Sequence, residues 1–247
     1  MTIGIIAGSG FDRLDELEVL HETHGTTPWG RASAPVQQGR LHGQPVLFLS
    51  RHGVGHALAP HEINYRANVA ALRDAGASAL LGVYTVGGIT AGVLEPGTLV
   101  VPHQIVDYTW GREHTYSQPG DVLHVDFSEP FDGPLREVLV TAAREEGGAG
   151  APPVVDGGVY GASQGPRLET AAEIDRMERD GCDVVGMTGM PEVSLARELG
   201  MRIAGICLVV NPAAGRGVIS MDEIRETAAA GRARILATLA RAVPRIS

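Results

Sequence analysis

The stretch Ile3-Gly4-Ile5-Ile6-Ala7, followed by Gly8-Ser9-Gly10, decides the fold class because an apolar run leads directly into a flexible turn. Apolar residues without polar alternation are typical of a strand that is covered on both faces. The same pattern recurs along the chain. It predicts strands at 3–7, 46–50, 79–86, 98–106, 158–162, 184–187 and 203–210.

Helical segments lie between these predicted strands. We expect helices at 60–75, 134–146, 169–180 and 192–199, each followed by a glycine that is suited to end it. A last helix is expected to begin at Ser220, because Ser220 and Glu223 have the spacing of a capping box. Segments 21–45 and 107–133 are polar and rich in Pro and Gly, and we expect long loops there. The alternation favours an α/β sandwich, whose ligands usually bind outside the carboxyl ends of the strands.

The composition limits the classes of function. A chain of 247 residues without linker or repeat fits one domain, 1–247, and the excess of 29 acidic over 20 basic residues argues against nucleic-acid and membrane partners. All basic residues are Arg, so a Schiff-base lysine and a Walker-type lysine are excluded. Cys182 and Cys207 stand alone in apolar stretches, which predicts core positions. Without a basic leader or a spanning apolar run, we expect a cytoplasmic protein.

Two motifs near the N-terminus are suited to bind an anion. Gly8-Ser9-Gly10 offers backbone amides and a hydroxyl to an oxyanion, although a tight turn is the simpler interpretation. Arg51 and His52 follow the predicted strand 46–50, where a guanidinium can clamp a phosphate bidentately; a solvated turn is the alternative. His56 and His61 follow closely, but no carboxylate stands at HExxH spacing, so we expect no metal site.

Three later strand ends carry polar residues next to flexible ones. Thr85 lies in Tyr84-Thr85-Val86-Gly87-Gly88, and Thr188 precedes a helix whose N-terminus favours anions. Met187, beside Thr188, is by itself more typical of a core position. Asn211 ends the most apolar strand, where Pro212 restrains it to extended geometry. An amide in that place is suited to recognise a base.

In this order, the segments resemble the trimeric purine nucleoside phosphorylase and 5′-methylthioadenosine phosphorylase family. The resemblance rests on residues 4–10, Arg51-His52-Gly53, Asn64-Tyr65-Arg66-Ala67-Asn68, Thr85-Val86-Gly87-Gly88, Glu129-Pro130-Phe131, Gly165-Pro166-Arg167-Leu168-Glu169-Thr170, Met187-Thr188 and Pro191-Glu192-Val193. It covers nearly the whole chain. It implies a single-domain, three-layer α/β sandwich with a mixed central sheet of the phosphorylase/hydrolase-like type, a homotrimer, and no metal or organic cofactor.

The activity that this resemblance implies is phosphorolysis. Inorganic phosphate, a co-substrate, attacks the anomeric carbon of a purine nucleoside and releases the base and a sugar 1-phosphate. The family match assigns phosphate to Ser9, Arg51, His52, Thr85, Val86 and Thr188, and the nucleoside to Leu168, Glu169, Met187, Asn211, Ala213 and Met221. A phosphate fixed beneath the ribose stabilises its developing positive charge and is placed for attack. The expected catalytic residues are Asn211, Arg51 and His52.

The base end of the match points to a 6-oxopurine. The methylthioadenosine enzymes carry Asp residues where this chain has Asn211-Pro212-Ala213. An Asn accepts from a protonated N7 and donates to a 6-oxo group, and Glu169 accepts from the N1–H of the same base. We therefore expect hypoxanthine or guanine as the base.

The sugar end points to a 5′-alkylthio group. Met221 stands where the 6-oxopurine enzymes offer a His to the 5′-hydroxyl, and an apolar contact favours a thioether. His56 matches a position near the 5′ end of the sugar, and His124 matches one that a neighbouring subunit contributes. The combination implies S-methyl-5′-thioinosine as the substrate.

Other functions remain open from the sequence. Within the family they are an inosine or guanosine phosphorylase and a 5′-methylthioadenosine phosphorylase. Outside it they are a nucleotide-dependent oxidoreductase, a nucleoside hydrolase and a catalytically silent nucleoside-binding protein. The repeated anion motifs argue against all three of the latter.

Overall fold

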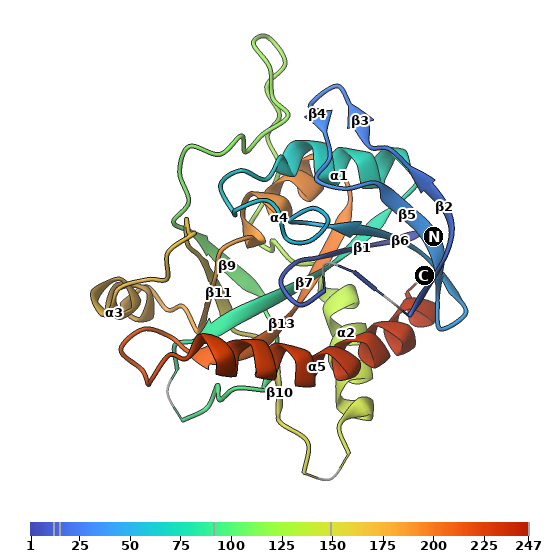
Figure 1. Cartoon of the computed structure of the whole chain (residues 1–247). Helices are drawn as coiled ribbons and strands as arrows, with labels where there is room; N and C mark the ends of the chain where they lie inside the picture. The colour runs from blue at the N-terminus through green and yellow to red at the C-terminus, as the bar shows by residue number, and fades with distance from the viewer. Residues whose placement is uncertain (12, 15, 91, 149, 247) are drawn as a thin grey trace.

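The computed structural model of the chain describes residues 1–11, 13–14, 16–90, 92–148 and 150–246 (Figure 1). Its strands are β1 (Ile3–Ala7), β2 (Leu17–Thr23), β3 (Thr26–Thr27), β4 (Gly30–Arg31), β5 (Val36–Leu41), β6 (Gln44–Ser50), β7 (Ala79–Gly88), β8 (Leu99–Val101), β9 (Gln104–Asp107), β10 (Val154–Asp156), β11 (Val159–Ala162), β12 (Val184–Gly186) and β13 (Arg202–Pro212). Its helices are α1 (Tyr65–Asp74), α2 (Gly133–Glu146), α3 (Ala171–Arg179), α4 (Gly189–Glu198), α5 (Met221–Ala242) and the 3₁₀ turn η1 (Val243–Arg245).

A mixed sheet runs through the centre of the described structure. Its main path is β10-β8-β13-β7-β1-β6-β5-β2, and the long strand β7 also pairs with β12, which leads on to β11 and β9. The central strands β6, β1, β7 and β13 are parallel, whereas β5 pairs antiparallel with β6, and β12 antiparallel with β7. The prediction of a mixed central sheet is confirmed.

Helices cover both faces of this sheet, which gives three layers. Figure 1 shows α1 and α4 above the sheet and α2 and α5 below it. Leu139 and Leu239 pack with Ile5 on one face, while Val69 and Val193 pack with Leu47 on the other. The predicted three-layer sandwich is confirmed. It brings the carboxyl ends of the central strands to one edge, where Ala7 lies opposite Ser50 and Val83.

Side-chain caps determine where several helices begin. Asn64 accepts a hydrogen bond from the Ala67 N–H, so α1 begins at Tyr65 rather than at residue 60. The last helix begins after Ser220 as predicted, and the Ser220 hydroxyl accepts from the Glu223 N–H. A full capping box between Thr170 and Glu173, which we did not predict, starts α3.

Two predictions of secondary structure were wrong. The segment 98–106 contains two strands, β8 and β9, which pair with different neighbours on either side of Pro102. The segment 21–45 is largely an antiparallel edge of the sheet and not a loop. Its polar composition has a physical reason: β2 is the edge strand, and it exposes every residue except Leu17, so water reaches both of its faces.

The structure also bears on the cysteines and on the expectation that no segment spans a membrane. Cys182 and Cys207 are free and buried, as the sequence predicted. Among the residues that the structure describes, no helix has both the length and the apolar character needed to cross a bilayer.

Candidate active site

A cavity of about 500 Å³ opens at the carboxyl ends of β1, β6, β7, β12 and β13. Most of the predicted site residues line it: Ser9, Arg51, His52, His56, Thr85, Val86, Leu168, Glu169, Met187, Thr188, Asn211 and Met221. The structure thus brings together residues from seven separate segments of the sequence. Ala213 and His124 are the two predicted residues that do not line this cavity.

Gly8 lets two nitrogen-bearing side chains lie close against the end of β1. A Cβ placed on Gly8 would lie 2.9 Å from Arg51 Nη1 and 3.1 Å from His52 Nε2. These contacts are too short for a carbon atom, so a side chain at residue 8 would displace one or both groups. The absence of a side chain there therefore allows the Arg51 guanidinium and the His52 ring to lie side by side at this end of the cavity.

His52 faces this end of the cavity with a defined tautomer. Its Nδ1 lies 2.8 Å from the carbonyl oxygen of Leu58, which can only accept, so Nδ1 carries the hydrogen. Burial lowers the pKa of His52 from 6.5 to about 4; the bond to Leu58 opposes this, and the charges of Arg51 and His56 add to it. The neutral ring therefore presents Nε2 as an acceptor, which suits a phosphate that still carries a proton.

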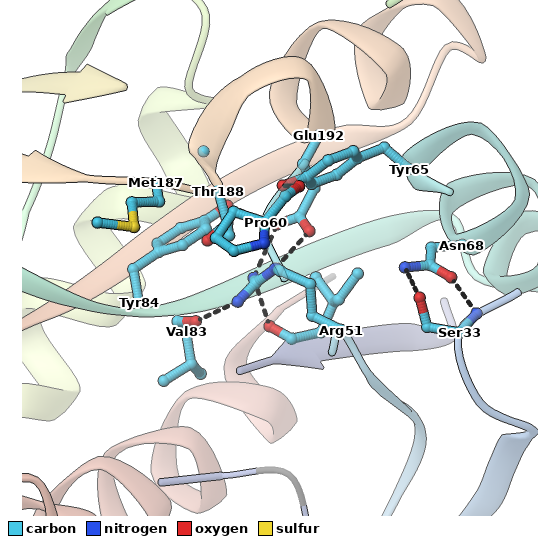
Figure 2. A network of polar contacts seen from close by, with 12 residues as sticks. Ser33, Arg51, Pro60, Tyr65, Asn68, Val83, Tyr84, Met187, Thr188 and Glu192 are labelled. Atoms are coloured by element: carbon cyan, nitrogen blue, oxygen red, sulfur yellow. Dashed lines mark hydrogen bonds and ion pairs between the residues drawn. The ribbon is translucent and has the colours of Figure 1, made fainter. Parts of the chain in front are cut away.

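Arg51 is held by protein groups on almost every side. Its Nε and Nη2 donate to the carboxylate of Glu192 at 2.7 and 2.9 Å, Nη1 donates to the Val83 carbonyl, and Nη2 also donates to that of Ile6. Figure 2 shows the guanidinium enclosed between these groups. Burial alone would lower the pKa of Arg51, but the ion pair with Glu192 outweighs it and raises that pKa. The side chain is only 1% exposed.

This arrangement corrects the predicted bidentate clamp. A guanidinium has five N–H groups, and the bonds to Glu192, Val83 and Ile6 use four of them. One Nη1 N–H has no partner among the described residues and is left for a ligand. Arg51 is thus first a buried ion pair that fixes the strand ends, and it offers an anion a single hydrogen bond.

Thr188 contributes a hydroxyl without the help of a helix end. We expected the N-terminus of α4 to favour an anion there, but Met190 has non-helical backbone angles (φ −113°, ψ 140°), so the regular turns begin after it. The carboxylate of Glu192 occupies the first turn. The Thr188 hydroxyl caps no backbone N–H and lines the cavity together with Ser9 and Thr85.

The base-recognition residues lie on two facing segments of the cavity. Asn211 follows an irregularity in the pairing of β13 with β7, and its Nδ2 donates to the Pro212 carbonyl at 2.7 Å, which leaves one N–H and Oδ1 for a ligand. Glu169 accepts a hydrogen bond of 2.5 Å from the Ser163 hydroxyl through Oε1. Ala213 lies in a buried apolar cluster and does not line the cavity, so its contact with the nucleoside stays a prediction.

The remaining side of the cavity is apolar and open. Met221 at the start of α5 is 54% exposed, and Leu168 is 40% exposed. The ring of His56 stacks on that of His52, with 4.1 Å between centroids. A thioether or another small apolar group fits such a margin better than a charged one.

His124 lies in the segment 108–132, which connects β9 to α2. Part of this segment projects from the body as the green loop at the top of Figure 1. His124 is exposed, as are the apolar side chains of Val122, Leu123 and Val125 beside it. The residue does not reach the cavity of its own chain.

Sequence reasoning missed Arg112, which ties the segment 108–132 to the cavity walls. Its Nη1 donates to the Met187 and Met190 carbonyls, on either side of Thr188, and its Nη2 donates to that of Gln164 at 2.7 Å. The side chain is buried although it lies in a stretch that we expected to be a surface loop. An Arg in a polar segment gives no signal of such burial.

The composition of the cavity offers no metal site. Among the described residues, no group of three His, Cys, Asp or Glu side chains is placed to hold a metal ion. The chemistry available there comes from hydroxyls, one guanidinium N–H, two imidazoles, an amide and a carboxylate.

Comparison with known proteins agrees with this geometry. Residues 2–244 match the family model described as the phosphorylase superfamily. A probable S-methyl-5′-thioinosine phosphorylase of Pseudomonas syringae pv. tomato is 50% identical over 98% of both chains. A probable 6-oxopurine nucleoside phosphorylase of Thermococcus kodakarensis is 41% identical, over 91% of this chain and 83% of its own.

Solved structures show the same architecture. The methylthioadenosine phosphorylase of Schistosoma mansoni in complex with adenine superposes with a TM-score of 0.90 at 34% identity, covering 99% of this chain and 91% of its own. The same arrangement of layers and strands therefore occurs in proteins that are named after nucleosides with different bases.

Proposed function

Because this chain belongs to the phosphorylase superfamily, we propose that it catalyses the phosphorolysis of S-methyl-5′-thioinosine to hypoxanthine and 5-methylthioribose 1-phosphate. One observation carries the proposal: a single cavity holds Glu169 and Asn211 together with the apolar Met221. The first two are complementary to a 6-oxopurine, and the third to a thioether. The names of several relatives at 41–50% identity agree with this substrate.

The phosphate binds at the end of the cavity that Ser9, Arg51 and His52 line. Ser9, Thr85 and Thr188 donate hydroxyl hydrogens, and Arg51 donates one N–H. Val86, a residue of β7 on the cavity wall, contributes a backbone contact. A phosphate oxygen attacks C1′ of the ribose, which lies over Met187, while the bond from C1′ to N9 breaks.

The leaving base receives the bonding electron pair, so negative charge develops on it, and N7 takes up a proton from water at the open side of the cavity. Asn211 Oδ1 accepts from N7–H, its free amide N–H donates to the 6-oxo group, and Glu169 accepts from N1–H. Negative charge thus develops on the base while positive charge develops on the ribose above the phosphate. Fixed groups at both ends therefore act on the transition state more than on the bound nucleoside.

We propose that the enzyme is a homotrimer in which His124 reaches the cavity of a neighbouring subunit near the 5′ end of the sugar. The exposed apolar residues on either side of His124 support this. Sedimentation should give three times the chain mass of 25.9 kDa. Val122→Asp in the apolar group should then yield monomers, and His124→Ala should raise the nucleoside KM without dissociating the trimer.

A second candidate substrate is inosine. The high exposure of Met221 leaves the 5′ end of the sugar open, so that water can satisfy a hydroxyl there. The Thermococcus relative, named as a 6-oxopurine nucleoside phosphorylase, agrees with this alternative.

The test is the release of base from S-methyl-5′-thioinosine, S-methyl-5′-thioadenosine, inosine and adenosine, each with and without phosphate. We expect hypoxanthine from S-methyl-5′-thioinosine as the dominant, phosphate-dependent product. A preference for inosine would reassign the sugar end alone. Adenine as the main product would contradict the role given to Asn211, and base release without phosphate would indicate a hydrolase.

A further inference from the structure

Ser163 makes the shortest polar contact with a base-recognition residue. Its hydroxyl donates to Glu169 Oε1 at 2.5 Å, and Oε2 has no partner among the described residues. Ser163 lines a second cavity of about 250 Å³ that lies next to the main one, and Glu169 lines both. The carboxylate therefore forms the partition between the two cavities, with the Ser163 hydroxyl on the far side from the nucleoside.

The position of this hydroxyl is fixed by the surrounding backbone. Ser163 directly follows β11, and its N–H donates to the Gly186 carbonyl at 2.8 Å. Arg112 holds the next carbonyl, that of Gln164, at 2.7 Å. The side chain of Ser163 is 6% exposed. A donor held in this way is preorganised and loses little conformational freedom when the base binds.

The chemistry of the pair bears on which purine fits. A hydroxyl that donates to a carboxylate forms a charge-assisted bond, and an ionised carboxylate can only accept. The N1 of a 6-oxopurine carries a hydrogen and donates to such an acceptor. The N1 of a 6-aminopurine carries a lone pair and is repelled by it.

The second cavity also offers Glu169 a competing position. Arg167 and Arg176 line it, paired with Glu173 and Asp180, and the charge of Arg167 still interacts with Glu169 and favours a carboxylate that turns away from the nucleoside. Without the Ser163 hydroxyl, nothing in the described structure holds Glu169 at the partition.

We propose that Ser163 is a positioning residue that makes the site selective for 6-oxopurines, by holding Glu169 as a fixed acceptor at the edge of the main cavity. The inference rests on the proposed function, because it concerns the base of the same nucleoside. Ser163 touches Glu169 and not the substrate.

The test compares Ser163→Ala with Ser163→Thr, which keeps a hydroxyl, at saturating phosphate. We expect Ser163→Ala to lower kcat/KM for S-methyl-5′-thioinosine about tenfold to hundredfold, mainly through KM, while the value for S-methyl-5′-thioadenosine changes less than about threefold. Ser163→Thr should retain the selectivity of the parent. Thr90→Val is a matched control, because it removes a hydroxyl that donates to a carboxylate, Asp183, outside both cavities.

A double-mutant cycle separates positioning from a general structural effect. In a Glu169→Ala background, Ser163→Ala should cause no further loss. Equal losses on both nucleosides, or losses that add to those of Glu169→Ala, would overturn the proposal. If Ser163→Ala does not fold, Ser163→Cys, with its weak donor, gives the same comparison.

Direct binding keeps this inference distinct from the proposed function. Calorimetry with hypoxanthine and with adenine, in the presence of phosphate, reports base selectivity without turnover. If the parent protein selects hypoxanthine but shows no phosphorolysis, only the proposed function is contradicted. If Ser163→Ala has the same base selectivity as the parent, only the role of Ser163 is contradicted. A parent protein that does not select hypoxanthine overturns both.

Discussion

Replacing Gly8 by Ala places one methyl group against the two side chains, Arg51 and His52, that we assign to the phosphate. The new Cβ would lie 2.9 Å from Arg51 Nη1 and 2.9 Å from His52 Cδ2. Both contacts are too short, and both neighbours are held, Arg51 by Glu192 and two carbonyls and His52 by Leu58. The methyl group therefore strains this end of the site and shifts Arg51 Nη1 or the His52 ring from its place.

The size of the effect follows from the hydrogen bond that the methyl group removes. A phosphate oxygen that the shifted Arg51 Nη1 no longer reaches loses a hydrogen bond to a charged group, and such a bond is worth about 1.5–3 kcal/mol. The KM for phosphate should rise about tenfold to hundredfold, and the KM for the nucleoside should stay nearly constant. The assay is the initial rate of base release as a function of phosphate concentration at saturating nucleoside.

Gly133→Ala is the matched control. Gly133 has ordinary backbone angles, and a Cβ there would meet no atom within 4 Å, so its phosphate KM should equal that of the parent. An unchanged phosphate KM in a folded Gly8→Ala variant would refute the assignment of the anion to Arg51 and His52.

Four further changes test other parts of the structure. Asn211→Asp should lower 6-oxopurine turnover and raise 6-aminopurine turnover, because a carboxylate cannot donate to the 6-oxo group; an unchanged ratio would show that this residue does not read the base. Met221→His should improve inosine relative to S-methyl-5′-thioinosine, since an imidazole gives the 5′-hydroxyl a partner, and the ratio of the two kcat/KM values measures this. His52 has a pKa of about 4 in the folded chain and 6.5 unfolded, so the unfolded state binds the extra proton between these values and stability falls as pH falls through that window. Urea unfolding at pH 7 and pH 4 should show the parent losing about 3 kcal/mol more than His52→Gln. Glu192→Gln leaves a buried guanidinium unpaired and should reduce the free energy of unfolding by about 3–5 kcal/mol, whereas Glu173→Gln, in an exposed ion pair, should reduce it by about 1 kcal/mol or less; similar losses would contradict the weight given to burial.

The central strands were predictable because burial on both faces leaves a continuous apolar run. The strands at 3–7, 79–86 and 203–210 were found in this way, and they correspond to β1, β7 and β13. The strands β2 and β5 were missed because water reaches both faces of β2 and part of β5, and this permits the polar residues that are also typical of loops. Hydrophobicity thus reports how a strand is covered more reliably than whether a strand exists.

The residues of the candidate site were predictable where they follow a strand. Thr85, Thr188 and Asn211 stand at strand ends, and a family resemblance orders such segments. The partners that hold them could not be found by spacing. Glu192 lies 141 residues from Arg51 in the sequence, and nothing local to either residue indicates the other.

The ion pair between Arg51 and Glu192 has a consequence for turnover. The two charges cancel, and His52 is neutral at pH 7, so these three residues bring no net charge to the phosphate end of the cavity. Binding there depends on the directions of short contacts and little on long-range attraction, so the rate at low phosphate should vary weakly with ionic strength. A doubly charged sugar phosphate can then leave without working against a strong field.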